Sequence, residues 1–278
     1  MFANRTLLIA TKHSKEFVIA PLFEKSLMVK CVVNHDFDTD LLGTFSGEIE
    51  RKSDVIETLR KKCLLALQST NFDLVVASEG SFGAHPSHFL AHADDEFLMF
   101  KDLKNNLEII ERKLSFKTNF NQTVVENQKM LEDFAQKVMF PSHGIILKSS
   151  EKNPESIIKD CSTLSQLIEA FYSLKRNHNS VFVETDMRAH KNPTRMEIIK
   201  ETTIQILKKI NTLCPNCKFP GFDVKKINPG LPCESCGFKT KSTLSHIYGC
   251  NACNFTEEVF FPLDKKTEEP LYCDFCNP

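Results

Sequence analysis

Four Cys-x-x-Cys motifs between Cys214 and Pro278 constrain the fold of this chain more than any other feature of its sequence. Two residues between thiolates let both sulfurs of a tight turn bind one ion, and two such turns complete a closed tetrahedral site. A closed site has no open position for a substrate, so we expect two structural zinc ions. Their predicted ligands are Cys214, Cys217, Cys233, Cys236, Cys250, Cys253, Cys273 and Cys276.

The spacing of these motifs leaves two pairings open. The first two motifs are separated by 15 residues and the last two by 19, so pairing in order along the chain gives two consecutive zinc ribbons. An interleaved pairing uses the same residues. A redox function is the weaker interpretation, because no motif lies in a βαβ context. The other three of the 11 cysteines, Cys31, Cys63 and Cys161, have no partner motif and are expected to be free thiols.

Apolar and amphipathic segments alternate before the cysteines and predict an α/β domain with a mixed sheet over residues 1–212, followed by the zinc-binding module over 213–278. Strands are expected over 6–10, 29–33, 72–77, 96–103, 107–116, 145–148 and 181–183. Helices are expected over 16–27, 54–67, 125–138, 164–174 and 194–210. Asp54 with Glu57 forms a capping-box pattern, and Asn192 before Pro193 is a good N-cap.

The charge balance argues against nucleic acid as a partner. The whole chain carries a formal charge of −1, and the cysteine module contains seven lysines and eight acidic residues. Eight thiolates with two Zn²⁺ ions lower the formal charge of the module to about −5, which repels phosphate backbones. The module is therefore expected to be structural, with protein contact left open.

The apolar runs, such as residues 7–10, are too short to span a bilayer or to form a signal-peptide core. We therefore expect a cytoplasmic protein with no membrane contact. The sequence leaves a homodimer open.

Polar residues gather in three segments that follow predicted strands, namely 11–16, 78–86 and 184–195. Ligands of open α/β sheets bind beyond the carboxyl ends of the strands, so these segments are expected to share a pocket. The competing interpretation takes the lysines and arginines as ordinary solvated charges, the glycines as turn residues and Glu57 as a solvent-facing or capping residue.

The same residues resemble a family described as a domain of unknown function. The matching segments are Ala10–Glu16 (ATKHSKE), Leu42–Glu48, Ser78–Gly83, Pro141–Gly144, Glu184–Met196 and the C-terminal Cys-Asn-Pro. This resemblance extends over nearly the whole chain and implies no particular activity.

The order of elements is also similar to that of the inosine-triphosphate pyrophosphatase and Maf superfamily, whose members hydrolyse nucleoside triphosphates with Mg²⁺. Thr11, His13 and Lys15 correspond to its phosphate loop, although this loop is one residue shorter and has His in place of Asn. The resemblance further aligns Glu57 and Lys62 on a helix, Glu79 at a strand end, and Asp186, Arg188 and His190 before the last helix.

This resemblance implies an inosine-triphosphate-pyrophosphatase-like fold and a metal-dependent nucleotide pyrophosphohydrolase or related nucleotide-binding hydrolase. Glu57 and Glu79 would hold Mg²⁺, and Lys15 and Lys62 would stabilise the departing pyrophosphate. The expected substrate-binding residues are Thr11, Lys12, His13, Ser81, His85, Asp186, Arg188, His190 and Arg195. The alternative is a non-catalytic adaptor that binds a nucleotide or a protein and uses the zinc ribbons as a docking surface.

Overall fold

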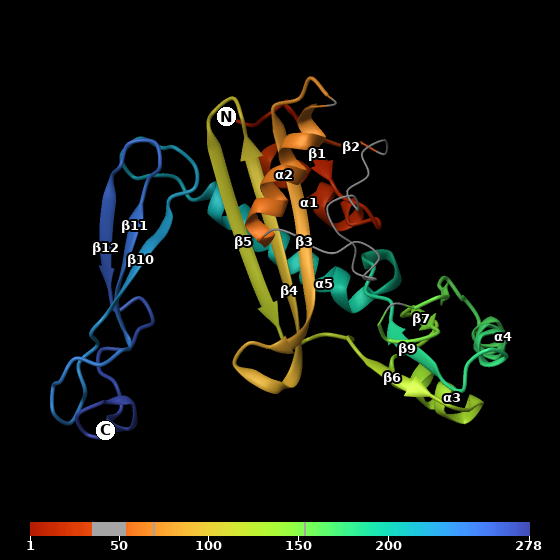
Figure 1. Ribbon diagram of the computed structural model, residues 1–278. Helices are drawn as coiled ribbons and strands as arrows, with labels where there is room; N and C mark the ends of the chain where they lie inside the picture. Colours follow the sequence, from red (N-terminus) through yellow and green to blue (C-terminus); the bar gives the residue numbers. More distant parts are fainter. Residues whose placement is uncertain (35–53, 69, 153) are drawn as a thin grey trace. The chain divides into compact units, whose positions relative to one another are not determined.

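The computed structural model describes residues 1–34, 54–68, 70–152 and 154–278. The chain divides into two compact units, Met1–Ile206 and Leu207–Pro278 (Figure 1). The 42–48 segment named above lies outside the described residues. Among the described helices, none is both long and apolar enough to cross a bilayer.

A five-stranded sheet forms the centre of the first unit, in the order β2-β1-β3-β4-β5. The strands β1, β2 and β3 are parallel, β4 pairs antiparallel with β3, and β5 pairs antiparallel with β4, so the expected mixed sheet is confirmed. The strand bounds are β1 Thr6–Ala10, β2 Lys30–Val33, β3 Leu74–His85, β4 His88–Asp102 and β5 Leu107–Ser115.

Two helices cover this sheet. Helix α2 (Val55–Gln68) packs its buried Leu59 and Cys63 into an apolar cluster with β1, β3 and Met99 of β4. Helix α1 (Glu16–Leu27) places Phe23 against Phe100, with ring centroids 5.9 Å apart. Neighbouring residues of a strand point to opposite faces, so α1 and α2 cover opposite faces of the sheet.

The hairpin of β3 and β4 is longer than the sequence indicates. Residues 78–86 were predicted to be a loop, but the structure continues β3 through them to His85, paired with the equally extended β4. The prediction was wrong because glycine and serine are poor strand formers, while the long ladder supplies hydrogen bonds that override local propensity. Figure 1 shows this hairpin running past the ends of the two helices.

A second, four-stranded sheet follows in the first unit, in the order β6-β9-β7-β8, and all of its pairs are antiparallel. Its core contains Leu131 and Phe134 from α3 and Phe171 from α4. Val125, predicted to begin a helix, instead ends β6, because it pairs with Val181. The bounds are β6 Gln122–Val125, α3 Gln128–Lys137, β7 Ile145–Lys148, β8 Ile157–Ile158, α4 Leu164–Lys175 and β9 Val181–Thr185.

Of the two N-terminal caps predicted from the sequence, one forms as expected and the other forms only in part. The long helix α5 (Pro193–Asn211) begins as predicted, because Asn192 Oδ1 accepts a hydrogen bond from the backbone N–H of Arg195 at 3.0 Å. At α2, Asp54 accepts from the Ile56 N–H at 3.2 Å, but Glu57 pairs with Arg60 instead of completing the capping box.

The second unit contains a three-stranded antiparallel sheet in the order β10-β11-β12. Successive strands run between the cysteine motifs, so each strand carries the chain from one end of the sheet to the other. The strands are β10 Asp223–Pro229, β11 Thr243–Gly249 and β12 Thr256–Phe260.

A buried ion pair links the residue before β1 to the last residue of β4. Arg5 donates to both carboxylate oxygens of Asp102, at 2.6 and 2.7 Å, and the Asp102 side chain is fully buried. Burial alone raises the pKa of Asp102, but the hydrogen bonds from Arg5 and Asn105 outweigh it and lower the pKa below its usual range. This pair therefore stabilises the fold above the unfolded pKa of about 3.9 and loses that effect at lower pH.

We expect Arg5→Met to lower the free energy of unfolding of the first unit by about 3 kcal/mol at pH 7, because Asp102 would remain buried without its cation. Urea unfolding followed by circular dichroism measures this difference. Lys129→Met is the control, since Lys129 pairs with Asp133 on the exposed surface of α3 and should change stability by less than about 0.5 kcal/mol. Equal effects of the two substitutions would contradict the prediction.

Candidate functional site

The eight clustered cysteines form two groups of four. Cys214, Cys217, Cys250 and Cys253 make the first, and the second comprises Cys233, Cys236, Cys273 and Cys276. The sulfur–sulfur distances include 3.7 Å for Cys214–Cys253, 3.6 Å for Cys217–Cys250, 3.9 Å for Cys233–Cys276 and 3.7 Å for Cys236–Cys273. Four sulfurs at about 2.3 Å from a tetrahedral ion lie about 3.8 Å apart, so both groups have the dimensions of a zinc site.

The pairing is interleaved, and this decides between the two possibilities that the spacing leaves open. The first and third motifs share one group, and the second and fourth share the other. The three-stranded sheet is the cause, because antiparallel strands return the chain to alternate ends. A seven-residue strand spans roughly 20 Å, which keeps motifs that follow one another along the chain apart. Two consecutive ribbons are therefore not formed.

The first three motifs share one local structure, Cys-x-x-Cys followed by a residue of positive φ and then Phe. The positive-φ residues are Lys218, Gly237 and Asn254, with φ of 61°, 70° and 57°. In each turn the N–H of this residue donates to the carbonyl of the first cysteine, as Lys218 does to Cys214 at 2.9 Å. A backbone amide near the sulfur lowers the pKa of Cys253 to about 6 and that of Cys233 to about 7, whereas contact with neighbouring thiols and burial raise the pKa of Cys217 and Cys276 to about 12. Thiolates are the form that binds zinc.

The two cysteine groups differ in how far the aromatic side chains around them are buried. Around the first, Phe222 is buried with Cys214 and Cys250, and its ring stacks on Tyr248. At the second, the stacked rings of Phe238 and Phe275 are 51% and 69% exposed. The second group therefore has an exposed aromatic surface, whereas the first contributes to the core of the module.

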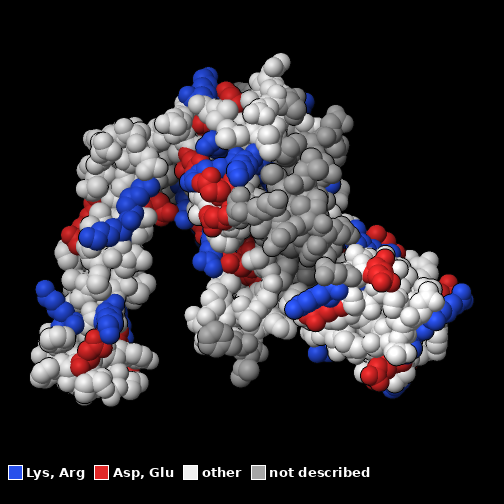
Figure 2. Space-filling model, in the orientation of Figure 1, with Lys and Arg blue, Asp and Glu red and all other residues white. Residues whose placement is uncertain are grey.

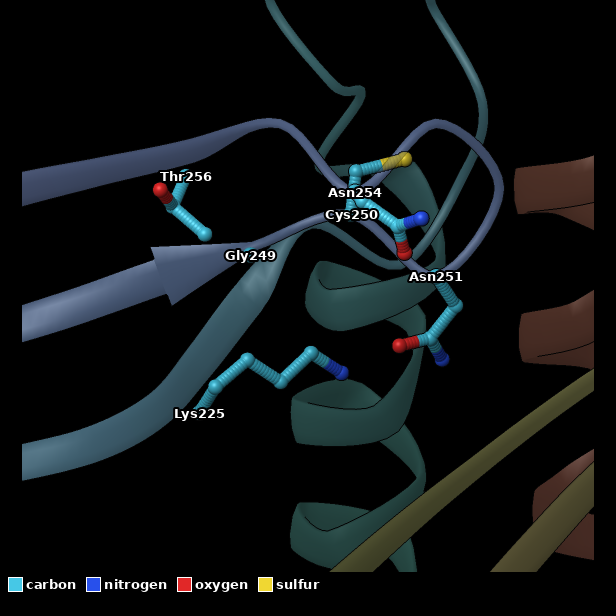
Figure 3. Close-up of a pocket in the computed structure, with 6 residues that line it drawn as sticks. All are labelled: Lys225, Gly249, Cys250, Asn251, Asn254 and Thr256. Carbon is cyan, nitrogen blue, oxygen red and sulfur yellow. The ribbon is translucent and has the colours of Figure 1, made fainter.

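An open hollow lies beside the first group, in the second unit. Figure 3 shows the side chains of Lys225 and Asn251 directing their polar ends toward each other. Its lining residues are Lys225, Gly249, Cys250, Asn251, Asn254 and Thr256. The lining includes a predicted zinc ligand but none of the residues expected to bind substrate.

In the first unit, two buried lysines converge on β3 at Ser78. Lys15 Nζ donates to Ser78 Oγ at 3.0 Å, and Lys62 Nζ donates to the Ser78 carbonyl at 3.2 Å. Lys62 also pairs with the Glu79 carboxylate, and both of these side chains are 7% exposed. Burial, together with the nearby Arg195, lowers the pKa of Lys15 to about 7.

A third buried cation, Arg195, contacts the adjacent residues of the hairpin. Arg195 Nε donates to Glu96 Oε1 at 2.6 Å, and both side chains are fully buried. The Arg195 guanidinium also lies over the Phe82 ring, 4.9 Å from its centroid. Gly80 pairs with Glu96 across the ladder, and a Cβ at Gly80 would lie 2.4 Å from Glu96 Oε1. Glycine therefore allows the close approach of the ion pair to the strand, because a side chain here would have to displace the two charged groups.

The segment after β9 reaches the same region. The ring of His190 stacks on His13, with centroids 5.3 Å apart, so the loop after β1 and the segment after β9 are in contact. Asp186 is fully buried and accepts hydrogen bonds from Arg188, which also binds Asp160. Burial, with Arg188 nearby, lowers the pKa of His190 and favours its neutral form.

Most of the predicted site residues therefore lie in this region, and two do not. Thr11 is buried and Lys12 half-buried in the loop after β1, while Ser81 is half-buried on the same face of β3 as Glu79. Glu57, however, is 53% exposed and paired with Arg60. His85 stacks on Phe116 at the far end of β3, about 17 Å along the strand from Gly80.

Asp94 and Glu96 are not among the site residues predicted from the sequence. Both are on the Gly80 and Phe82 face of the hairpin, and both are buried, at 1% and 0% exposure. Burial and the neighbouring Glu96 raise the pKa of Asp94 to about 8. The detectable signal was two acids spaced by two residues, immediately before the apolar alternation of Leu98 and Phe100, because that spacing places them on one face.

Charges on the visible surface are mixed. Figure 2 shows acidic and basic side chains interspersed on this face rather than gathered by sign. This view gives no basic face of the kind that phosphate backbones require.

The first unit thus defines an α/β protein with a buried polar cluster, joined to a module with two four-cysteine centres. The chain belongs to the family described as a domain of unknown function (DUF6671), whose model matches residues 62–278. Among solved structures it is similar to the crystal structure of protein VC0702 from Vibrio cholerae, with 10% identity, 74% of this chain and 94% of that chain covered, and a TM-score of 0.31. No curated protein matches the chain.

The interleaved pairing predicts the zinc content of double variants. Cys214→Ser with Cys250→Ser should leave one zinc per chain, because both residues belong to the first group and the second stays complete. Cys214→Ser with Cys233→Ser should leave none, since each group loses a ligand. Elemental analysis of the purified chains measures both. Pairing in order would give the reverse result, zero zinc in the first variant and one in the second.

Proposed function

We propose that residues 1–206 form a metal-dependent nucleotide pyrophosphohydrolase, or a related nucleotide-binding hydrolase, with an inosine-triphosphate-pyrophosphatase-like fold. The observation that carries this proposal is the convergence of three buried cations, Lys15, Lys62 and Arg195, on residues 78–82 of β3. Lys62 and Arg195 are paired with Glu79 and Glu96, whereas Lys15 donates to the uncharged Ser78 hydroxyl. A phosphate group would give Lys15 an anionic partner, which a buried cation normally requires.

The lysines suit the phosphate chemistry for a physical reason. Charge develops on the leaving pyrophosphate as the phosphoanhydride bond breaks, and a fixed cation in a water-poor site stabilises it more than water does. Lys15 and Lys62 are already positioned by Ser78, so little reorganisation is needed when substrate binds. Arg195 is held in place by Glu96 and by the carbonyl of Met187.

Glu79 is assigned to the attacking water. It lies on β3 directly after the residue that positions both lysines, and its carboxylate is held by Lys62. A carboxylate fixed in this way can accept a proton from a water or orient it toward phosphorus. His13, Asp186, Arg188 and His190 would face the base or sugar, because the His13–His190 stack joins their two segments.

The expected metal pair of Glu57 and Glu79 does not fit the geometry. Glu57 is exposed and bound by Arg60, and it is five residues from Lys62, which places it about 140° around the helix from the residue that holds Glu79. The acids of β4 are better ligands, since Asp94 and Glu96 present carboxylate oxygens inside the polar cluster. A bound Mg²⁺ would supply neutralisation of phosphate charge and a more acidic water.

The cysteine module is assigned two structural zinc ions, and a reducing compartment such as the cytoplasm would keep its thiols available for them. The alternative function, a non-catalytic adaptor, is favoured by one observation, the exposed stacked rings of Phe238 and Phe275 at the second group. Aromatic side chains of this kind are enriched where proteins bind one another. Nucleotide binding without turnover would support the adaptor.

Glu79→Gln should reduce pyrophosphate release by roughly a hundredfold or more, because the substitution removes the charge that orients the water while keeping the size of the side chain. The measurement is pyrophosphate release with saturating Mg²⁺ over a panel of canonical and modified nucleoside triphosphates. Glu57→Gln is the matched control and should retain wild-type turnover, since Glu57 lies on the exposed side of α2. Undiminished turnover in a folded Glu79→Gln protein would remove Glu79 from the mechanism.

The lowered pKa of Lys15 predicts a pH dependence. The ammonium form binds phosphate, and it is lost as the pH rises above about 7, so kcat/KM of the wild-type chain should fall on the alkaline side. Arginine stays protonated, so Lys15→Arg should move this alkaline fall above pH 9. A profile of kcat/KM from pH 5 to 10 tests both statements. An unchanged alkaline limb in Lys15→Arg would assign the titration to another group.

A further inference from the structure

Two carboxylates of β4 are buried without the hydrogen bonds that burial normally demands. Asp94 is 1% exposed and Glu96 is fully buried, yet both oxygens of Asp94 and Oε2 of Glu96 have no hydrogen-bond partner among the described residues. An isolated buried carboxylate costs several kcal/mol, and native proteins satisfy the great majority of such groups. Three unsatisfied acceptor oxygens on one face of one strand therefore point to a bound group that donates to them or coordinates them.

In the part of the chain that the structure describes, no side chain donates a hydrogen bond to these oxygens. Arg195 directs its Nε at the other oxygen of Glu96, Oε1, and its Nη1 at the carbonyl of Met187. Lys15 is bound to Ser78. Lys15 and two of the three Arg195 nitrogens are thus committed to other atoms, and the third, Nη2, donates no hydrogen bond to these oxygens.

We infer that Asp94 and Glu96 form a divalent-cation site of the Mg²⁺ or Mn²⁺ class, open to a phosphate oxygen. The inference rests on the proposed function for the identity of the phosphate ligand. Mg²⁺ is usually held by one or two carboxylates, with waters and substrate phosphates completing its coordination. Two carboxylates meet this requirement, and their neutralisation by the ion removes the cost of burying them.

The geometry of the hairpin organises the two ligands. Asp94 and Glu96 are two residues apart on β4, so both project from the same face, about 7 Å apart at the backbone. Arg195 anchors Glu96 through Oε1 and leaves Oε2 for the ion. Gly80 opposite Glu96 leaves the space that this arrangement needs, and Phe82 pairs with Asp94.

The charges of the surrounding side chains favour a cation that binds together with an anion. On the face of the hairpin that holds these acids, Lys15 and Arg195 balance Asp94 and Glu96, and on the other face Lys62 balances Glu79, so the region is close to neutral before any ligand binds. A divalent cation adds a charge of +2, which a polyphosphate then compensates. The competing account is a protonated Asp94 that binds no metal.

A manganese titration of the zinc-loaded full chain tests this inference, because electron paramagnetic resonance detects free Mn²⁺ and is blind to Zn²⁺. The wild-type chain should bind one Mn²⁺, displaceable by Mg²⁺. Asp94→Asn should weaken this affinity at least tenfold and should remain folded, since it removes no hydrogen bond. Asp95→Asn is the matched control and should stay within twofold, because Asp95 lies on the opposite face and pairs with Arg112.

A second measurement on the wild-type chain does not depend on any variant. Bound Mn²⁺ should broaden the amide resonances of Gly80 and Phe82 at concentrations that leave Lys129 of α3 unaffected. Lack of Mn²⁺ binding, equal affinity in Asp94→Asn, or broadening elsewhere would overturn the site. Mn²⁺ bound at Asp94 without pyrophosphate release would keep the site and refute the hydrolase. Hydrolysis without Mn²⁺ bound at Asp94 would refute the site and keep the proposed hydrolase activity.

Discussion

The fully buried ion pair of Arg195 and Glu96 is the interaction on which the polar centre of the first unit depends. It joins the start of α5, which follows the four-stranded sheet, to β4 of the five-stranded sheet. A buried pair of this kind contributes little net stability compared with apolar packing, but breaking it leaves an uncompensated buried charge. The pair also constrains its neighbours: it occupies the space where a Gly80 side chain would lie, Phe82 lies under the guanidinium, and one oxygen of Glu96 makes no hydrogen bond to the described residues.

The polar centre combines groups whose charge states depend on one another. Burial lowers the pKa of Lys15 to about 7 and raises that of Asp94 to about 8, and in both cases desolvation is the largest cause. A protein that had to bury these groups for packing alone would gain by replacing them with apolar side chains. Their presence in the buried interior of the first unit is the physical basis for assigning chemistry to this region, and phosphate with a divalent cation is the ligand class that satisfies both signs of charge.

The cysteine module has a different physical constraint, which is its small size. A small segment with short strands buries too little apolar surface to be stable alone, and two tetrahedral metal sites would supply the missing free energy. Because the sites lie at opposite ends of one antiparallel sheet, each strand is fastened at both ends. The exposed rings at the second group are then available for contact, whereas the first group is enclosed by aromatic side chains.

The sequence by itself determined the elements whose signals are local. The eight cysteines as two sets of four, the start of α5 at Asn192, and β7 and α1 with their bounds all follow from spacing, capping and periodicity. Tertiary structure decided whatever depends on partners distant in the chain. The extension of β3 through Ser78–His85 needed β4, the interleaving of the cysteines needed the register of three strands, and the burial of Asp94 and Glu96 needed Arg195, 99 residues from Glu96 along the chain. Local propensity contains no information on such pairings, because their free energy comes from contacts that exist only once the chain has folded.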